Sequence, residues 1–229
     1  AKRFGELGAR VLIASRKESV LAEAVRILQE QGIESAYCVC DIRKADQVEQ
    51  LISFALQRWQ QLDIVVNNAA GNFPASIEQL SPNGFKTVVD IDLNGTFNVT
   101  KMAFEQALKA NGGSIINITA PFAGWGVAYQ VNCAAAKAGV DSLTRTAAVE
   151  WAPFGVRVNA VAPGSVANTE GVERLSEALV GEPPSEAVCT ADDIANAVVF
   201  LASDAAKFIS GEIIRVDSAS GVDMLKLPV

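Results

Sequence analysis

The chain alternates short runs rich in β-branched residues with longer amphipathic segments, and this alternation limits the folds open to it. Each short run has the length of one strand, and each longer segment repeats its apolar residues with a helical period. Units of this kind assemble into a parallel sheet covered by helices, so the pattern predicts a doubly wound α/β fold. The expected strands are residues 10–14, 35–40, 64–67, 114–118, 156–161 and 212–216, and the expected helices are residues 18–31, 44–60, 82–110, 127–151 and 191–201.

The length of 229 residues, half of them hydrophobic, suits one domain with one sizeable core. The sequence contains no internal repeat, low-complexity tract or interdomain linker, so we expect residues 1–229 to form a single domain. Residues 163–190 mix polar and apolar residues with glycines and prolines, which predicts a mobile flap over a site.

The start of the chain differs from what a doubly wound nucleotide-binding domain requires. Residues 1–8 resemble the end of an amphipathic helix that leads into the first expected strand. Such a domain places a strand and a glycine-rich, phosphate-binding turn before that helix. We therefore expect the sequence to be N-terminally incomplete, and we expect poor cofactor affinity for a chain that really begins at Ala1.

Composition excludes several classes of function. A net charge of −7 argues against nucleic acids and anionic membrane surfaces as partners, since both are bound through clustered cations. No apolar run reaches the roughly 18 residues that span a bilayer. The chain has no histidine, and Cys38, Cys40, Cys133 and Cys189 lack the spacing of a zinc site. We therefore expect reduced thiols and no metal centre.

Two groups near the ends of the first strands could bind the adenosine part of a dinucleotide. Arg16 and Lys17 follow the first strand, where a guanidinium suits a 2′-phosphate and an acidic residue would favour NAD. The alternative is a solvated pair of cations that opens a helix. Asp41 follows the second strand and could accept from the adenine amino group, or equally cap the next helix.

Small and polar residues follow two later strands. Asn67 and Asn68 precede Ala69, Ala70 and Gly71, whose small side chains would let the backbone approach a flat ligand. The asparagines can also tie neighbouring strand ends together. The later dipeptide at residues 163–164, Pro163 and Gly164, fits the place of a nicotinamide ring but is by itself only a turn signal.

The reacting end of the site is predicted around Lys137. This lysine lies among alanines and a glycine, so it either extends to solvent or is held by a ligand. Asp92 and Asn94 lie in a helical pattern although both residue types are mediocre helix formers, which suggests a kink that turns polar groups inward. Cys133 precedes Lys137 by four residues on the same helix face.

These residues resemble the short-chain dehydrogenase/reductase family over essentially the whole chain except its start. Residues 68–73, 85–88, 90–99 and 149–151 look more narrowly like the 2,4-dienoyl-CoA reductases of the peroxisomal type, and residues 169–175 point the same way. The resemblance implies a Rossmann-type fold, NADPH as cofactor, an acyl-CoA thioester as substrate, and a homotetramer that packs helices 90–110 and 127–151 across two-fold axes.

The resemblance also implies roles for individual residues. Lys137 matches the lysine that holds the nicotinamide ribose hydroxyls, and Asp92 matches the acidic catalytic residue of the subgroup. Asn94 matches an asparagine of the mitochondrial-type enzymes, whose tyrosine and serine would align with Phe122 and Cys133. The implied cofactor-binding residues are Arg16, Lys17, Asp41, Ile42, Asn68, Ala69, Ala70, Lys137, Pro163, Gly164 and Val166.

The usual catalytic hydroxyls of the family are absent. Cys133 stands where the family has its tyrosine and Ala120 where it has its serine, so ordinary ketone reduction is the least expected activity. Reduction of a conjugated dienoyl thioester instead forms an extended enolate that takes its proton at carbon. We hypothesise that Lys137 adds positive charge, that Asp92 positions a proton-delivering water, and that Asn94 helps to orient this water or the thioester. Cys133 is expected to be a buried structural cysteine.

The sequence leaves other functions and the compartment open. A trans-2-enoyl thioester reductase would use much the same site, and a catalytically silent fold that acts as a binding protein is the alternative of a different class. The chain ends in residues 226–229, Lys-Leu-Pro-Val, which differ from the peroxisomal Ser-Lys-Leu type of signal. We expect a cytoplasmic bacterial protein or one of an organellar matrix.

Overall fold

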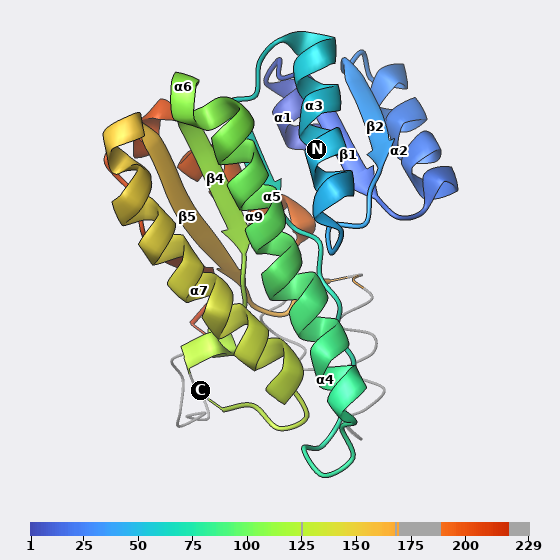
Figure 1. The fold of residues 1–229 in the computed structure, drawn as a ribbon, viewed down its shortest axis with the longest axis vertical. Helices are drawn as coiled ribbons and strands as arrows, with labels where there is room; N and C mark the ends of the chain where they lie inside the picture. The colour runs from blue at the N-terminus through green and yellow to red at the C-terminus, as the bar shows by residue number, and fades with distance from the viewer. Residues whose placement is uncertain (125, 168, 170–188, 220–229) are drawn as a thin grey trace.

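The structure of the chain, a computed structural model, confirms a parallel α/β fold of the Rossmann type (Figure 1). It describes residues 1–124, 126–167, 169 and 189–219. Every strand pair in this part of the chain is parallel, and each expected strand is found within two residues of its predicted bounds. The strands are β1 (Val11–Ser15), β2 (Ser35–Val39), β3 (Ile64–Asn67), β4 (Gly113–Ile118), β5 (Val156–Pro163) and β6 (Ile213–Val216).

Helices cover both faces of the sheets. Phe4 packs against the apolar clusters of both α2 and α9, so α1, α2 and α9 share one face. The other face carries α3, α5 and α7, and Figure 1 shows α5 and α7 in front of β4 and β5. No helix among the described residues is long and apolar enough to cross a membrane. The helices are α1 (Lys2–Glu6), α2 (Glu18–Glu30), α3 (Ala45–Trp59), α4 (Pro82–Val89), α5 (Gly95–Ala103), α6 (Lys109–Asn111), α7 (Val131–Trp151) and α9 (Ala191–Ala202).

Two of the expected helices differ from their predicted form. The segment predicted as one helix over residues 82–110 contains two π-helical turns, η1 (Asp90–Asn94) and η2 (Phe104–Leu108). The predicted kink is therefore a widened turn, a device that is frequent at functional sites. The helix predicted from residue 127 begins instead at Val131, because Tyr129 has a φ of 65° that no α-helix accommodates.

The strands form two separate sheets, β1–β2 and β3–β4–β5–β6. One edge of β1 and one edge of β3 carry no partner strand, and both edges line a single cavity of about 1030 Å³. Apolar side chains of α3 and α9 close this cavity, among them Ile52 and Ile194. We call this cavity the strand slot, because two parallel edges and two helical walls enclose it.

The backbone groups of both edges point into the strand slot. The Ser15 carbonyl accepts from the Cys40 N–H of the β2 segment, so the neighbouring Ala14 directs its N–H and C=O toward the slot. The Asp63 carbonyl likewise accepts from β4, which turns Ile64 toward the slot. Backbone groups in such a place require partners. The sequence-based expectation of one further central strand stays a prediction, and the strand slot is where it would lie.

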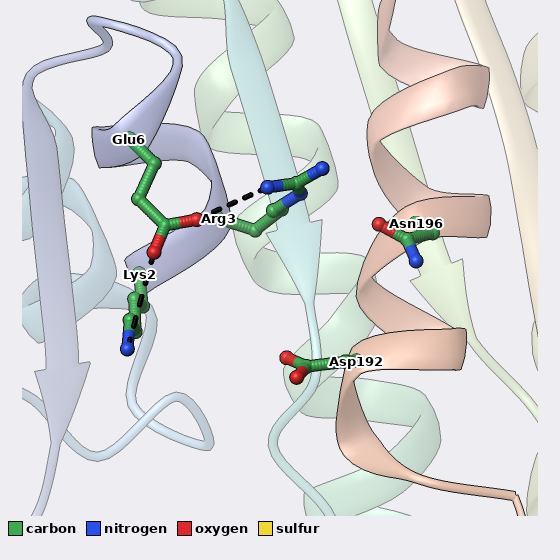
Figure 2. Close-up of a pocket in the computed structure, with 5 residues that line it drawn as sticks. All are labelled: Lys2, Arg3, Glu6, Asp192 and Asn196. Carbon is green, nitrogen blue, oxygen red and sulfur yellow. Dashed lines mark hydrogen bonds and ion pairs between the residues drawn. The ribbon is translucent and has the colours of Figure 1, made fainter.

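A second hollow, of about 300 Å³, lies between α1 and α9 and is polar (Figure 2). Glu6 pairs with Arg3 at 3.2 Å and with Lys2 at 3.9 Å, and Asp192 and Asn196 face them from α9. These side chains of α1 are solvent-exposed, and exposed pairs of this kind contribute little to stability. The hollow contains none of the predicted site residues.

An apolar strand added upstream of Ala1 should enter the strand slot and join the two sheets. The backbone amides of Ala14 and Ile64 should then exchange with solvent much more slowly, since they gain partners. The Val11 amide already donates to the Glu34 carbonyl and serves as the internal control. Hydrogen exchange of the chain with and without such an extension tests this, and equal exchange at Ala14 and Ile64 would refute it.

Candidate active site

The predicted cofactor residues gather at one edge of the sheets, because all strands are parallel and end there. Six of them line the upper end of the strand slot, and the others lie on or after the ends of neighbouring elements. Gly164 donates its N–H to the Val216 carbonyl, and Val166 pairs with Cys189. The six lining residues are Arg16, Asp41, Ile42, Asn68, Ala69 and Ala70. Lys17 and Pro163 do not line it.

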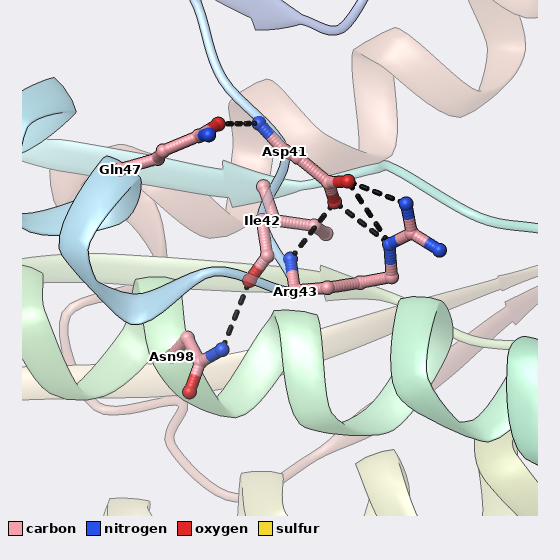
Figure 3. Close-up of polar contacts among 5 residues, drawn as sticks. All are labelled: Asp41, Ile42, Arg43, Gln47 and Asn98. Atoms are coloured by element: carbon pink, nitrogen blue, oxygen red, sulfur yellow. Dashed lines mark hydrogen bonds and ion pairs between the residues drawn. The ribbon is translucent and has the colours of Figure 1, made fainter.

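Asp41 is already bound by a neighbouring cation (Figure 3). Its carboxylate accepts from the side chain and the backbone N–H of Arg43, and this hydrogen bonding lowers the pKa of Asp41 to about 2. The alternative that Asp41 caps α3 is wrong, because Lys44 occupies the N-cap position without a side-chain bond. Its contact with adenine stays a prediction.

Ile42 is fastened to α5 rather than left in a free loop. Its carbonyl accepts from the Asn98 side chain at 2.9 Å (Figure 3). A Cβ at Gly95 would lie 2.5 Å from the Ile42 Cδ1 atom, so the glycine permits this close approach. The floor of the predicted adenosine site is therefore fixed by packing against α5.

A buried amide network ties the strand ends together, as the sequence predicted for the asparagines. Asn67 donates to Asn117 at 2.8 Å and to Thr100 at 2.9 Å, and Asn117 donates to Thr144 on α7 at 2.8 Å. Asn117 is fully buried. Sequence reasoning missed Asn117 and Thr144, although an asparagine inside a β-branched strand signals a structural role.

Lys137 and Asp92 form a buried ion pair. The Lys137 Nζ lies 3.5 Å from the Asp92 Oδ2 and donates to the Ile118 carbonyl at 2.9 Å. The other carboxylate oxygen of Asp92 accepts from the Gly71 N–H at 2.6 Å. Lys137 is 5% exposed and Asp92 is 0% exposed. Lys137 is thus held inside the protein, and the alternative that it extends to solvent is wrong.

Burial raises the pKa of Asp92 above its ordinary value. The charge of Lys137 and the Gly71 N–H oppose this shift, but desolvation of the carboxylate outweighs both. Asp92 therefore holds a proton at higher pH than an exposed aspartate does, which suits a group that supplies a proton.

Asn94 does not join this pair. It is exposed and donates to the Asp90 carboxylate at 3.0 Å, while Lys86 pairs with the other oxygen of Asp90. The π-helical turn directs Asp92 inward and leaves Asn94 on the surface. The structure therefore brings together two of the three predicted catalytic residues.

The two positions without hydroxyls are filled by buried side chains. Cys133 is 6% exposed, and burial raises the pKa of its thiol to about 11. Such a thiol is neither a nucleophile nor an acid of use at neutral pH. Ala120 is buried as well. All four cysteines are free thiols, as expected.

Sequence reasoning also missed a set of contacts that holds the loop after β3. The Asn72 amide donates to Gln130 at 2.7 Å, the Asn132 amide donates to the Phe73 carbonyl at 3.1 Å, and the Ala75 N–H donates to the Tyr129 carbonyl. Together with the bond from Gly71 to Asp92, these contacts fix residues 71–75 against the start of α7. The polar residues directly before the alanine-rich helix were the available signal.

A family model described as enoyl-(acyl carrier protein) reductase matches residues 1–219. A doubly wound sheet whose strand ends meet a buried lysine–aspartate pair is the arrangement of a dinucleotide-dependent oxidoreductase. With this match, the chain belongs to the short-chain dehydrogenase/reductase family.

Curated relatives narrow the comparison. The peroxisomal 2,4-dienoyl-CoA reductase, (3E)-enoyl-CoA-producing, of Arabidopsis thaliana is 39% identical over 95% of this chain and 78% of its own length. A protein of Bacillus subtilis titled probable 2,4-dienoyl-CoA reductase, (2E)-enoyl-CoA-producing, is 39% identical over 95% of this chain and 89% of its own.

Solved structures agree on the fold. The citronellol catabolism dehydrogenase AtuB of Pseudomonas aeruginosa PAO1 superposes with a TM-score of 0.85 at 37% identity, covering 96% of this chain and 88% of that one. An actinorhodin polyketide ketoreductase variant solved with NADPH gives a TM-score of 0.91 at 27% identity, covering 97% and 91%.

Cys133 should resist alkylation in the folded protein, because its thiol is buried and almost wholly protonated at pH 8. Replacement by alanine should leave turnover close to that of the wild type. Mass spectrometry after iodoacetamide treatment measures the first effect, with Cys38 as the partly exposed comparison. Rapid labelling of Cys133, or loss of activity in Cys133→Ala, would show that the thiol takes part.

Proposed function

We propose that the protein reduces a 2,4-dienoyl-CoA thioester to an enoyl-CoA with NADPH, in the oxidation of unsaturated fatty acids. The observation that carries this proposal is the buried Lys137–Asp92 pair in a site whose tyrosine and serine positions hold Cys133 and Ala120. A site without those hydroxyls lacks the usual proton donor to a ketone oxygen. The names of the relatives from Arabidopsis and Bacillus support the same reaction.

The residues at the strand ends fit NADPH. The charge of Arg16 reaches Asp41, so both lie at the same corner, and the guanidinium suits the 2′-phosphate. Ala69 and Ala70 line the cavity with small side chains. Lys137 retains a third N–H for a ribose hydroxyl beyond its contacts with Ile118 and Asp92. The ketoreductase with the same fold was solved with NADPH. When bound, NADPH supplies a hydride to the far end of the conjugated substrate.

Asp92 and Lys137 act on the charge and the proton that the substrate then requires. The extended enolate carries negative charge toward the thioester oxygen, and the buried ammonium of Lys137 lowers the energy of that charge. Asp92, with its raised pKa, passes a proton through a water to a carbon of the enolate. The Gly71 N–H holds the Asp92 carboxyl in place for this transfer.

One specific observation favours a second candidate. The matching family model is described as an enoyl-(acyl carrier protein) reductase, so a monoenoyl thioester is the alternative substrate. The two substrates differ by one double bond, and the site residues serve either one. A silent binding fold is less well supported, because it gives no reason for a buried ion pair at the strand ends.

The homotetramer also remains a proposal. The helices expected to pack across two-fold axes expose large apolar side chains, with Phe97 on α5 at 47% and Val149 on α7 at 78%. Exposed apolar residues on neighbouring helices favour an interface between copies. A bacterial cytoplasmic or organellar location is likewise proposed.

Turnover of 2,4-hexadienoyl-CoA should exceed that of crotonyl-CoA at equal concentration. The loss of NADPH absorbance with the full-length protein measures both, and NADH in place of NADPH tests the role assigned to Arg16. Faster reduction of crotonyl-CoA would establish the monoenoyl alternative. Binding of NADPH with no thioester turnover would contradict both reductase proposals.

Asp92→Asn should lower kcat by about 10²- to 10⁴-fold, the usual contribution of a positioned acid. The amide keeps an oxygen for the Gly71 N–H, so the loop contact survives while the ionisable group is lost. In the wild type the protonated Asp92 declines as pH rises through its raised pKa, and kcat should decline with it. A pH profile of kcat measures this, and an unchanged profile in the variant would remove Asp92 from the proton path.

A further inference from the structure

Among the described residues, four buried side-chain atoms have no hydrogen-bond partner, and three of them are oxygens: Asn72 Oδ1, Asp92 Oδ2 and Asp141 Oδ1. The fourth, Gln130 Nε2, is a nitrogen and hence a donor. Gln130 is 1% exposed, so its N–H groups are removed from bulk water. A buried donor left unpaired costs about 1–3 kcal/mol. Its presence therefore points to a partner that a ligand brings.

The position of Gln130 relates it to the reacting groups. Gln130 is the N-cap residue of α7, seven residues before Lys137, so both lie on one face about two turns apart. Cys133 and Lys137, both buried, continue the same stripe. Gln130 binds Asn72, and Asp92 binds the preceding residue, Gly71. The glutamine and the aspartate thus hold consecutive residues of one loop.

The contact with Asn72 also orients the amide. The Gln130 Oε1 accepts from the Asn72 side chain at 2.7 Å, which fixes the oxygen and directs the nitrogen to the other side of the amide plane. A preorganised neutral donor is what an oxygen with developing negative charge requires. The Cys133 thiol, one turn further along, is a weak donor in comparison.

We propose that Gln130 Nε2 donates a hydrogen bond to the thioester carbonyl oxygen of the substrate and stabilises the enolate that forms there. The proposal rests on the reductase function proposed above. Gln130 is then a catalytic residue at the carbonyl end of the conjugated system, while Lys137 and Asp92 serve the other end. The amide stabilises the oxyanion without transferring a proton to it.

The chain offers variants that separate donation from loop support. Gln130→Glu keeps an oxygen to accept from Asn72 but replaces the amino group with a second oxygen. Gln130→Met removes both functions. Gln106→Glu is the matched control, because Gln106 likewise accepts through its Oε1, from the Ser53 hydroxyl, on η2 away from the site.

At pH 8 both Gln130 variants should lose about 10²- to 10³-fold in kcat with 2,4-hexadienoyl-CoA, the usual effect of removing one oxyanion donor. NADPH binding should stay unchanged in both, and Gln106→Glu should match the wild type. The ratio of Gln130→Glu to wild-type activity should rise as pH falls, because a protonated glutamic acid is again a donor. Gln130→Met should show no such recovery.

A second readout does not depend on turnover. The absorption band of dienoyl-CoA bound with NADP⁺ should shift to longer wavelength in the wild type, where a donor polarises the carbonyl, and should lose this shift in Gln130→Met. A wild-type enzyme that reduces the dienoyl substrate equally well as Gln130→Glu at pH 8 would overturn the role of Gln130 alone. A wild type that binds NADPH but reduces no dienoyl thioester would overturn the proposed function itself.

Discussion

The buried ion pair between Lys137 and Asp92 is the interaction on which the site depends. Two opposite charges lie 3.5 Å apart, with 5% and 0% exposure, and burial costs several kcal/mol for each ion unless other groups compensate. The Ile118 carbonyl and the Gly71 N–H supply that compensation. The end of β4, the loop after β3 and the turn η1 are therefore held at one point on α7. Loss of either charge would leave the other unpaired, at a cost of about 3–5 kcal/mol.

The π-helical turn η1 and the small residues of α7 make this meeting possible. A Cβ at Gly139 would lie 2.7 Å from the Leu93 Cδ2 atom, so α7 approaches η1 closely only because residue 139 is glycine. The same approach brings the inward-facing Asp92 to Lys137. The alanines and the glycine around Lys137, which the sequence offered as a sign of ligand binding, thus have a packing cause as well.

The sequence predicted the strands and layers because β-branched runs and apolar periodicity act locally. It could not predict the π-helical turns, since these depend on contact between helices far apart along the chain. For the same reason Asp92 and Asn94, alike in type and two residues apart, were assigned together, although the turn buries the first and exposes the second. Gln130 was taken for helix interior, and only the positive φ of Tyr129 shows that the helix begins after it.

The protonation states of the site agree with a reaction that ends at carbon. A tyrosine in place of Cys133 would offer an acidic proton to the substrate oxygen, whereas burial raises the pKa of the thiol to about 11 and leaves it a weak donor. The remaining groups divide the work by charge: a cation at Lys137, a neutral amide at Gln130, and a carboxyl of raised pKa at Asp92. The oxygen of the enolate is stabilised by groups that keep their protons, so the proton from Asp92 goes to carbon and the thioester survives the reduction.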